Sequence, residues 1–368
     1  MNCYEKGTKI EKECVKIINL FGTWREMGRQ YGALLSEELK SMYVNGIEKH
    51  LFTDLQMDVD KVKEISQSFY GKFPFKFREF IVGIAETSGL EFEQLLVVNA
   101  LNVLLTRSSI ISTSTSIATW GEYSSDSLTY GINYDHQEWM KELRENLVFT
   151  VYHPADGSLA TVTIGFAGEI YVINGMNEKG IFVGLNDAEP SGGDLWYESR
   201  TPSVTNLFEF LLNSTSLDEM ETFFQTTKSN YAYIVGVADS QTARCYEWPV
   251  FEVKRRESHS RQGLAVMSNH FTEFSWGLPR PDDKANGFTR SRRQNLLTLA
   301  KHLKGSINDA VMMKIMDTKY EDMGATMINT IYQIVVVPSE YKIWFKTQKE
   351  DKWIDVNMKE FFSLKDGE

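Results

Sequence analysis

The spacing of hydrophobic residues divides the chain into a helical first part and a strand-rich remainder. Within residues 26–42, apolar side chains recur every three or four positions, which places them on one helix face: Met27, Tyr31, Leu34, Leu35, Leu39 and Met42. Further helices are predicted at Phe75–Glu86, just before Ser88 and Gly89, and at Phe92–Leu105. Residues 1 to about 113 are therefore expected to be mostly helical.

Two glycines lie within the first of these helices. Gly28 and Gly32 are four residues apart, so they share one face of the helix. A glycine inside a helix costs roughly 1 kcal/mol relative to alanine. We therefore expect a packing reason for both glycines, namely another backbone that approaches this face closely.

From about Thr115 onward the sequence changes to short stretches rich in β-branched and aromatic residues, separated by turn-forming residues. Strands are predicted at Ser127–Asn133, Leu147–His153, Ala160–Ile164, Ile181–Leu185, Tyr231–Ala238, Arg244–Trp248, Phe251–Lys254, Gln333–Val337 and Tyr341–Thr347. Helices are predicted at Thr205–Leu212, Leu217–Thr226 and Ser291–Lys304. Strands in two groups, with helices before, between and after them, indicate an α+β fold layered as an αββα sandwich.

The charge and the cysteine content of the chain exclude some classes of function. The net charge of −11 argues against a nucleic-acid partner, because phosphate binding needs a basic surface. Three cysteines, at positions 3, 14 and 245, are too few and too scattered for a disulfide framework, so reduced thiols in a cytoplasmic protein are expected. No apolar stretch is long enough to span a membrane, and no signal peptide is recognisable.

No motif for a cofactor or a metal is present. The sequence lacks a His-Glu-x-x-His zinc motif and a Gly-x-x-x-x-Gly-Lys phosphate loop. We therefore expect no cofactor and no metal. The expected partner is a small-molecule amide or acyl substrate, with neither nucleic acid nor membrane, and assembly into a homo-oligomer stays open.

Three motifs follow one another in the middle of the chain. A run of Ser and Thr at residues 112–116 leads into a short apolar strand. Gly-Ile-Asn-Tyr-Asp follows at residues 131–135. Gly-Met-Asn-Glu-Lys-Gly at residues 175–180 precedes Val-Gly-Leu-Asn at residues 183–186. Alone, each is also typical of a strand end or a hairpin turn.

Together these motifs resemble the N-terminal-nucleophile (Ntn) hydrolases, in the branch of the acyl-CoA:6-aminopenicillanate acyltransferase and the conjugated bile acid (choloylglycine) hydrolases. The resemblance covers roughly residues 20 to 345 and is nearer to the acyltransferase side, which has a long segment before the nucleophile. It implies an αββα core and scission of the chain between Thr113 and Ser114. Residues 1–113 would then be a helical pro-segment, and residues 114–368 the catalytic core.

The resemblance also implies a set of catalytic residues. The family's nucleophile is a cysteine, and Ser114 holds that place here. Asp135 follows Ser114 by 21 residues and would hold the freed amino group. An α-amino group has a pKa of about 8, so it can accept the proton of its own side chain near neutral pH. Asn186 and Asn269 would stabilise the oxyanion and the tetrahedral intermediate.

The remaining implied residues bind or position the substrate. Arg292 is expected to be the site arginine, with the register left open among Arg290, Arg292 and Arg293. Tyr134 and Arg293 are expected to contact the substrate. His270 is a candidate general base, but a histidine beside a strand-end asparagine is more often structural.

Serine at the place of cysteine leaves several hypotheses open. Ser114 is either natural or replaces a cysteine and so holds an uncut precursor. The leading hypothesis is a self-processing amidohydrolase or acyltransferase that acts on a non-peptide amide, with a bile-acid-type amidase as a narrower alternative. A catalytically inactive protein that binds an amide or acyl ligand is the second. An ordinary serine hydrolase is weaker, because no Gly-x-Ser-x-Gly motif is present.

Overall fold

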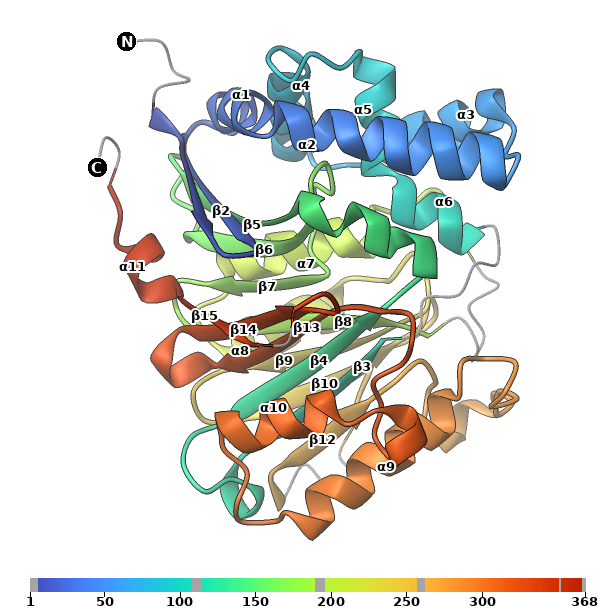
Figure 1. Ribbon diagram of the computed structural model, residues 1–368, viewed down its shortest axis with the longest axis vertical. Coiled ribbons are helices and arrows are strands. Elements are labelled where there is room, and N and C mark those ends of the chain that lie inside the picture. The colour runs from blue at the N-terminus through green and yellow to red at the C-terminus, as the bar shows by residue number, and fades with distance from the viewer. Residues whose placement is uncertain (1–5, 108–113, 189–195, 257–261, 351, 366–368) are drawn as a thin grey trace.

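The computed structural model describes residues 6–107, 114–188, 196–256, 262–350 and 352–365. These residues form four stacked layers: helices, a nine-stranded sheet, a six-stranded sheet and helices again (Figure 1). The α+β fold class and the αββα layering predicted from the sequence are thus confirmed. Among the described residues, no helix is long and apolar enough to cross a membrane.

The nine-stranded sheet runs through both parts of the chain. Its strands pair antiparallel, except β2 and β5, which run parallel. In spatial order they are β1 (Thr8–Lys12), β2 (Val15–Gly22), β5 (Leu147–Pro154), β6 (Thr161–Phe166), β7 (Asn174–Asn177), β8 (Phe182–Asp187), β9 (Tyr233–Ala238), β10 (Ala243–Trp248) and β11 (Lys254–Arg255).

The six-stranded sheet lies beneath it and is entirely antiparallel. Strand β3 begins directly after Ser114, and its neighbour β4 ends at Asp135. In spatial order the strands are β12 (Leu264–Met267), β3 (Thr115–Thr119), β4 (Thr129–Asp135), β13 (Thr330–Val337), β14 (Lys342–Thr347) and β15 (Ile354–Asn357).

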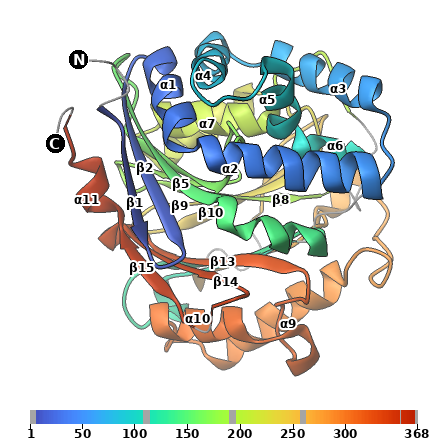
Figure 2. The ribbon, with the colours of Figure 1, turned by 45° about the horizontal axis from the view of Figure 1, so that its top comes forward.

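Helices cover the outer face of each sheet, as the tilted view also shows (Figure 2). The nine-stranded sheet is covered by α1 (Trp24–Leu34), α2 (Ser36–Ser41), the π-helix η2 (Met42–Asp54), α3 (Val59–Gly71), α4 (Phe75–Ala85), α5 (Phe92–Asn99), α6 (Leu101–Arg107), α7 (Ser203–Asn213) and α8 (Leu217–Thr226). The six-stranded sheet is covered by α9 (Thr289–His302) and α10 (Asp309–Asp317).

Shorter helices complete the chain. The last helix, α11 (Met358–Phe362), follows β15. Short 3-10 helices are η3 (Gly121–Tyr123), η4 (Glu138–Asn146), η7 (Phe274–Trp276), η8 (Tyr320–Asp322) and η9 (Pro338–Glu340).

Alternation along β3 and β4 separates two buried regions. Ala118, Tyr130 and Ile132 belong to the large hydrophobic core between the sheets. Ile117 faces the other way and packs with residues of α9 and α10. Because side chains alternate along a strand, Ser114 and Ser116 are in phase with Ala118, on the side between the sheets.

The expected close approach at the two helix glycines is confirmed. A Cβ atom on Gly28 would lie 2.1 Å from the carbonyl oxygen of Phe80, and one on Gly32 would lie 2.6 Å from that of Ile84. Both carbonyl groups belong to α4. Helices α1 and α4 therefore pack backbone against backbone, and this explains why a helix carries two glycines despite their cost.

The structure differs from the sequence-based prediction in a few segments. Residues 8–22 form β1 and β2, so the segment before Ser114 is not purely helical. The strand predicted at Phe251–Lys254 is wrong for its first three residues, because β11 contains only Lys254 and Arg255. Helices α3 and α10 were not predicted at all.

Candidate active site

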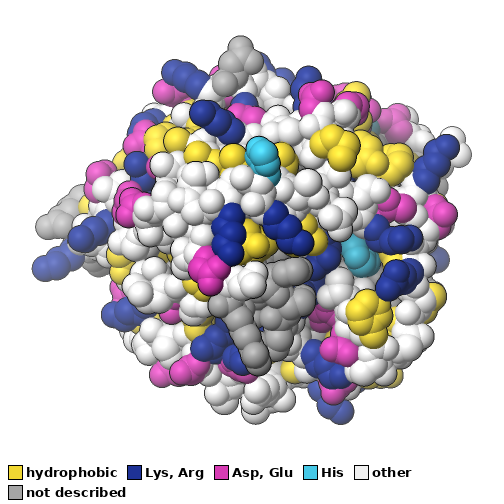
Figure 3. Space-filling model, turned by 90° about the horizontal axis from the view of Figure 1, so that it is seen from below, with side chains coloured by type: hydrophobic (Ala, Val, Ile, Leu, Met, Phe, Trp, Pro, Cys, Tyr) yellow, Lys and Arg dark blue, Asp and Glu magenta, His cyan; other side chains and the backbone are white. Residues whose placement is uncertain are grey.

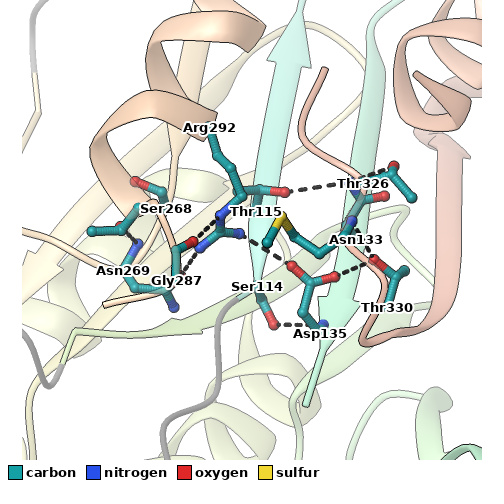
Figure 4. A network of polar contacts seen from close by, with 12 residues as sticks. Ser114, Thr115, Asn133, Asp135, Ser268, Asn269, Gly287, Arg292, Thr326 and Thr330 are labelled. Carbon is teal, nitrogen blue, oxygen red and sulfur yellow. Dashed lines mark hydrogen bonds and ion pairs between the residues drawn. The ribbon is translucent and has the colours of Figure 1, made fainter. Parts of the chain in front are cut away.

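Ser114 lies at the start of β3, at one end of the space between the sheets. Its side chain is buried, with the residue only 2% exposed. Its Oγ accepts a hydrogen bond from the backbone N–H of Asp135 at 3.4 Å, across the β3–β4 pair (Figure 4). Ser114 also lines a pocket. Thr113, on the other side of the expected scission, lies outside the described residues.

Asp135 and Arg292 form a fully buried ion pair beside Ser114. Nη1 of Arg292 lies 3.1 Å from Oδ2 of Asp135, and neither side chain is exposed. The other carboxylate oxygen accepts a hydrogen bond from the hydroxyl of Thr330 at 2.6 Å. Burial raises the pKa of Asp135 to about 7, while Arg292 and Thr330 act in the opposite direction.

Asn269 connects this ion pair to the other sheet. Its Oδ1 accepts from Nη2 of Arg292 at 3.0 Å, and its Nδ2 donates to the carbonyl oxygen of Asp187 at 2.8 Å. Asn269 follows β12, and Asp187 is the last residue of β8. A chain of contacts thus runs from Ser114 through Asp135, Arg292 and Asn269 to the end of β8.

Asn186 approaches from the nine-stranded sheet. Its Oδ1 accepts a hydrogen bond from Ser116 Oγ at 2.8 Å, two residues along β3 from Ser114. Asn186 is 1% exposed, and its Nδ2 has no hydrogen-bond partner among the described residues. A buried N–H group without a partner is costly, so an acceptor that binds there would satisfy it.

The structure distinguishes the three candidate arginines. Only Arg292 points into the site, and its Nε also donates to the Gly287 carbonyl oxygen at 2.7 Å. Arg293 instead donates from Nε to the Val266 carbonyl oxygen at 3.2 Å. Arg290 is exposed on α9.

Arg290 and Arg293 line a separate hollow together with His270 and Arg280. Figure 3 shows the α9–α10 side of the molecule, where Lys and Arg side chains lie close together near the middle of the face. Arg293 therefore lines this second hollow and not the pocket at Ser114, so the substrate contact expected of it is not supported at that pocket. His270 binds Ser268 and Thr289, which agrees with a structural histidine.

The pocket at Ser114 is narrow, with a cavity volume of about 30 Å³. Residues from α6, from both sheets, from α7 and from the segments after β6 and before α7 line it. They are Asn102, Val103, Thr106, Ser114, Tyr134, Tyr171, Ile173, Leu185, Asp187, Trp196, Val204 and Tyr233. Tyr134, expected to contact the substrate, thus shares the pocket with Ser114.

Several polar residues around the site were missed in the sequence. Thr330 faces Asp135 from β13, and Glu169 is a buried carboxyl behind the pocket. Neither belongs to a motif: only the pairing of β4 with β13 and the packing of α6 onto the nine-stranded sheet reveal them. Among the described residues, no group of three His, Cys, Asp or Glu side chains could hold a metal ion.

No protein-family model and no curated protein matches this chain. Among solved structures, it is similar to the Caenorhabditis elegans N-acylethanolamine-hydrolyzing acid amidase ortholog, with 18% identity and a TM-score of 0.45 over 61% of this chain and 92% of that one. It is also similar to a mutant of the Clostridium perfringens conjugated bile acid hydrolase, with 13% identity and a TM-score of 0.48 over 67% and 93%. A third similar structure is penicillin V acylase from Agrobacterium tumefaciens, with 12% identity and a TM-score of 0.42 over 66% and 86%.

Proposed function

We propose that this protein is a self-processing amidohydrolase that cleaves a non-peptide amide through an acyl-enzyme on residue 114. The observation that carries the proposal is the place of Ser114. Ser114 directly precedes β3 and lines a pocket, and it lies next to the fully buried ion pair of Asp135 and Arg292. Buried charges of this kind are expensive, so they favour a functional explanation over a merely structural one.

The first reaction would be the scission before Ser114. Oγ of Ser114 attacks the carbonyl carbon of Thr113, its proton passes to the departing nitrogen, and an ester replaces the peptide bond. Water then hydrolyses the ester, which leaves a carboxylate on Thr113 and a free α-amino group on Ser114. The chain would consist from then on of residues 1–113 and 114–368.

The freed amino group would serve as the base for turnover. It takes the Oγ proton as Oγ attacks the substrate amide, and it returns a proton to the leaving amine. The carboxylate of Asp135 stabilises the protonated amine, and Arg292 orients that carboxylate and opposes the rise in its pKa that burial causes. Water then hydrolyses the acyl ester and regenerates Ser114.

Asn186 and Asn269 would stabilise the negative oxygen that forms on the attacked carbonyl. Asn186 is buried, and its Nδ2 has no partner among the residues that the structure describes, so it could donate to this oxygen. Asn269 is held in place by Arg292 and by the end of β8. Removal of one such donor commonly costs about 3–4 kcal/mol of transition-state stabilisation.

The test combines intact mass spectrometry with an assay of amine release from a panel of acyl amides. A thiolate is the better nucleophile, so Ser114→Cys should split before residue 114 at least tenfold faster than the chain with Ser114. Ser114→Ala should stay whole and inactive. Ser125→Cys, in an exposed loop, controls for the added thiol.

Two results would contradict the proposal. A whole Ser114→Cys chain that still releases amine would indicate an ordinary serine-type or cysteine-type hydrolase. A whole chain that releases none would indicate a protein that only binds an amide or acyl ligand.

A further inference from the structure

The pocket at Ser114 has a polar wall that the proposed reaction does not use. Asn102, Tyr134 and Tyr171 line the pocket, and His136 and Glu169 lie behind them. These residues come from α6, from β4 and its end, and from the turn after β6. Their hydrogen bonds have a direction that can be followed from one group to the next.

His136 sets that direction. The backbone N–H of Gln137 donates to Nδ1 of His136 at 2.8 Å, so Nδ1 is the acceptor nitrogen of the ring. Burial lowers the pKa of His136 to about 4, so the ring is neutral and its one proton is on Nε2. Nε2 lies 2.8 Å from Oδ1 of Asn102, and it therefore donates to that oxygen.

The amide of Asn102 is oriented by this contact. With Oδ1 turned toward His136, its Nδ2 faces the opposite way. There it donates to the hydroxyl oxygen of Tyr134 and to Oε1 of Glu169, each at 3.3 Å. The hydroxyl of Tyr171 also donates to Glu169, at 3.4 Å, so its hydrogen is already engaged.

Tyr134 is thereby left as a donor. Its oxygen accepts from Asn102, and no described residue accepts its own hydrogen. Its ring is stacked on Tyr332, with centroids 4.6 Å apart and an 8° interplanar angle, so the ring orientation is fixed. Burial raises the pKa of Tyr134 far above neutrality, so the hydrogen stays on. A directed donor thus faces the pocket that Ser114 shares.

The other walls of the pocket are largely apolar or aromatic, and include Val103, Ile173, Leu185, Trp196 and Val204. We propose that this pocket binds the acyl part of the substrate, and that Tyr134 selects acyl groups that carry a hydrogen-bond acceptor, such as an ether or carbonyl oxygen. Asn102 and Glu169 are positioning residues for Tyr134. The inference rests on the proposed function, because the acyl group is the part that remains at residue 114 after the amine has left.

A plain alkyl chain in this pocket would bury the Tyr134 hydroxyl without a partner. Sites built to hydrogen-bond a substrate reject analogues that lack the matching group far more strongly than they sense one methylene. The test therefore uses 4-nitroanilides of hexanoic acid and of its 3-oxa, 4-oxa and 5-oxa analogues. These acyl groups have equal length and differ by one ether oxygen in place of a methylene.

The full chain should process one oxa-analogue with a kcat/KM at least tenfold above that of the hexanoyl compound. Tyr134→Phe should abolish this preference, so that the kcat/KM values for the oxa-analogue and the hexanoyl compound agree within about twofold. Asn102→Ala should weaken the preference, chiefly by raising KM for the preferred oxa-analogue. The matched control is Tyr332→Phe, which removes the hydroxyl of the stacked ring outside the pocket and should keep the preference. Equal kcat/KM values of the unsubstituted chain on all four compounds would overturn the inference.

A binding experiment separates this inference from the proposed function. The N-methylamides of the same four acids are titrated onto the full-length Ser114→Ala chain, and affinities are measured by saturation-transfer NMR. Tighter binding of one oxa-analogue, lost in Tyr134→Phe, would support the role of Tyr134 even if no variant turns over an anilide. Equal affinities beside measurable turnover would overturn the role of Tyr134 and leave the proposed reaction intact.

Discussion

Two buried carboxyl groups lie near Ser114, one from each sheet, and they differ in their partners. Asp135, at the end of β4, is 0% exposed and is paired with the guanidinium of Arg292. Glu169, just after β6, is 6% exposed and accepts only from neutral donors among the described residues: the Phe166 backbone, Asn102 and Tyr171. Burial raises the pKa of both groups to about 7.

The difference shows that equal burial does not give equal roles. The charge of Asp135 is balanced by a cation that cannot lose its proton under ordinary conditions. Its carboxyl group is therefore held in one orientation opposite a permanent cation. Glu169 has no cationic partner among the described residues, and it orients the neighbouring amide of Asn102 and hydroxyl of Tyr171.

The largest expected effect comes from breaking the ion pair. Arg292→Met should lower the free energy of unfolding by about 3–5 kcal/mol, because it leaves the Asp135 carboxylate buried without its cation. The measurement is urea denaturation at pH 7.5 in the Ser114→Ala background, where every variant is one uncut chain. Arg290→Met, on the exposed side of α9, should change stability little. Equal effects of the two substitutions would contradict the assigned importance of the pair.

Glu169→Gln should change the pH dependence of stability by about 3 kcal/mol. The folded pKa of Glu169 is about 7, against 4.5 for the free group, so the folded state holds its proton more tightly. The resulting stabilisation is complete below pH 4.5 and is lost as pH rises through about 7. Glutamine cannot titrate, so the variant should gain stability over the natural chain across this interval.

Urea denaturation at half-unit steps from pH 4.5 to 8 measures that gain. Asp135 titrates in both proteins and cancels from the difference. Glu37→Gln, on the exposed side of α2, controls for the loss of one carboxylate. A difference between Glu169→Gln and the natural chain that stays constant with pH would contradict the assignment for Glu169.

The smallest expected effects come from removing single hydroxyl groups that donate to Asp135 or to Glu169. Thr330→Val removes the 2.6 Å hydrogen bond to Asp135 and should cost about 2 kcal/mol at pH 8, where that carboxyl group is ionised. Tyr171→Phe removes the longer 3.4 Å bond to Glu169 and should cost about 1 kcal/mol at pH 5, where Glu169 is neutral. Urea denaturation measures both changes in the free energy of unfolding. A larger cost for Tyr171→Phe at that pH would reverse the ranking of the two networks.

Much of the fold could be predicted from the hydrophobic pattern alone. Strands β4, β5, β6, β8, β9 and β10 and helices α4, α7 and α8 follow directly from periodicity and turn residues. Strand β2 was missed because most of Val15–Gly22 is buried on both faces, which removes the alternation that signals a strand. Helix α10 was missed because its nine residues, Asp309–Asp317, offer few turns over which to read a period.

The site residues that belong to recognisable sequence motifs could be predicted. Ser114, Asp135, Asn269 and Arg292 were all named from the sequence, and the structure brings them into one chain of contacts; their catalytic roles remain predictions. The preference for Arg292 over Arg293 agrees with the contacts of the two side chains, because Arg292 binds Asp135 and Arg293 binds the Val266 carbonyl oxygen. Asn102 and Glu169 could not be found in the same way, because they meet only when α6 packs against the loop after β6.

The parallel pairing of β2 with β5 has a consequence for how the molecule would behave once divided. Main-chain hydrogen bonds join the two strands from Lys16 beside Val148 to Gly22 beside Pro154, in the interior of a continuous sheet. A nick before residue 114 would thus release nothing: the product would be a heterodimer whose halves are interlaced and separate only under denaturing conditions. Expressed as two independent polypeptides, the larger half would present β5 as a bare sheet edge and would tend to aggregate unless its companion were supplied during synthesis.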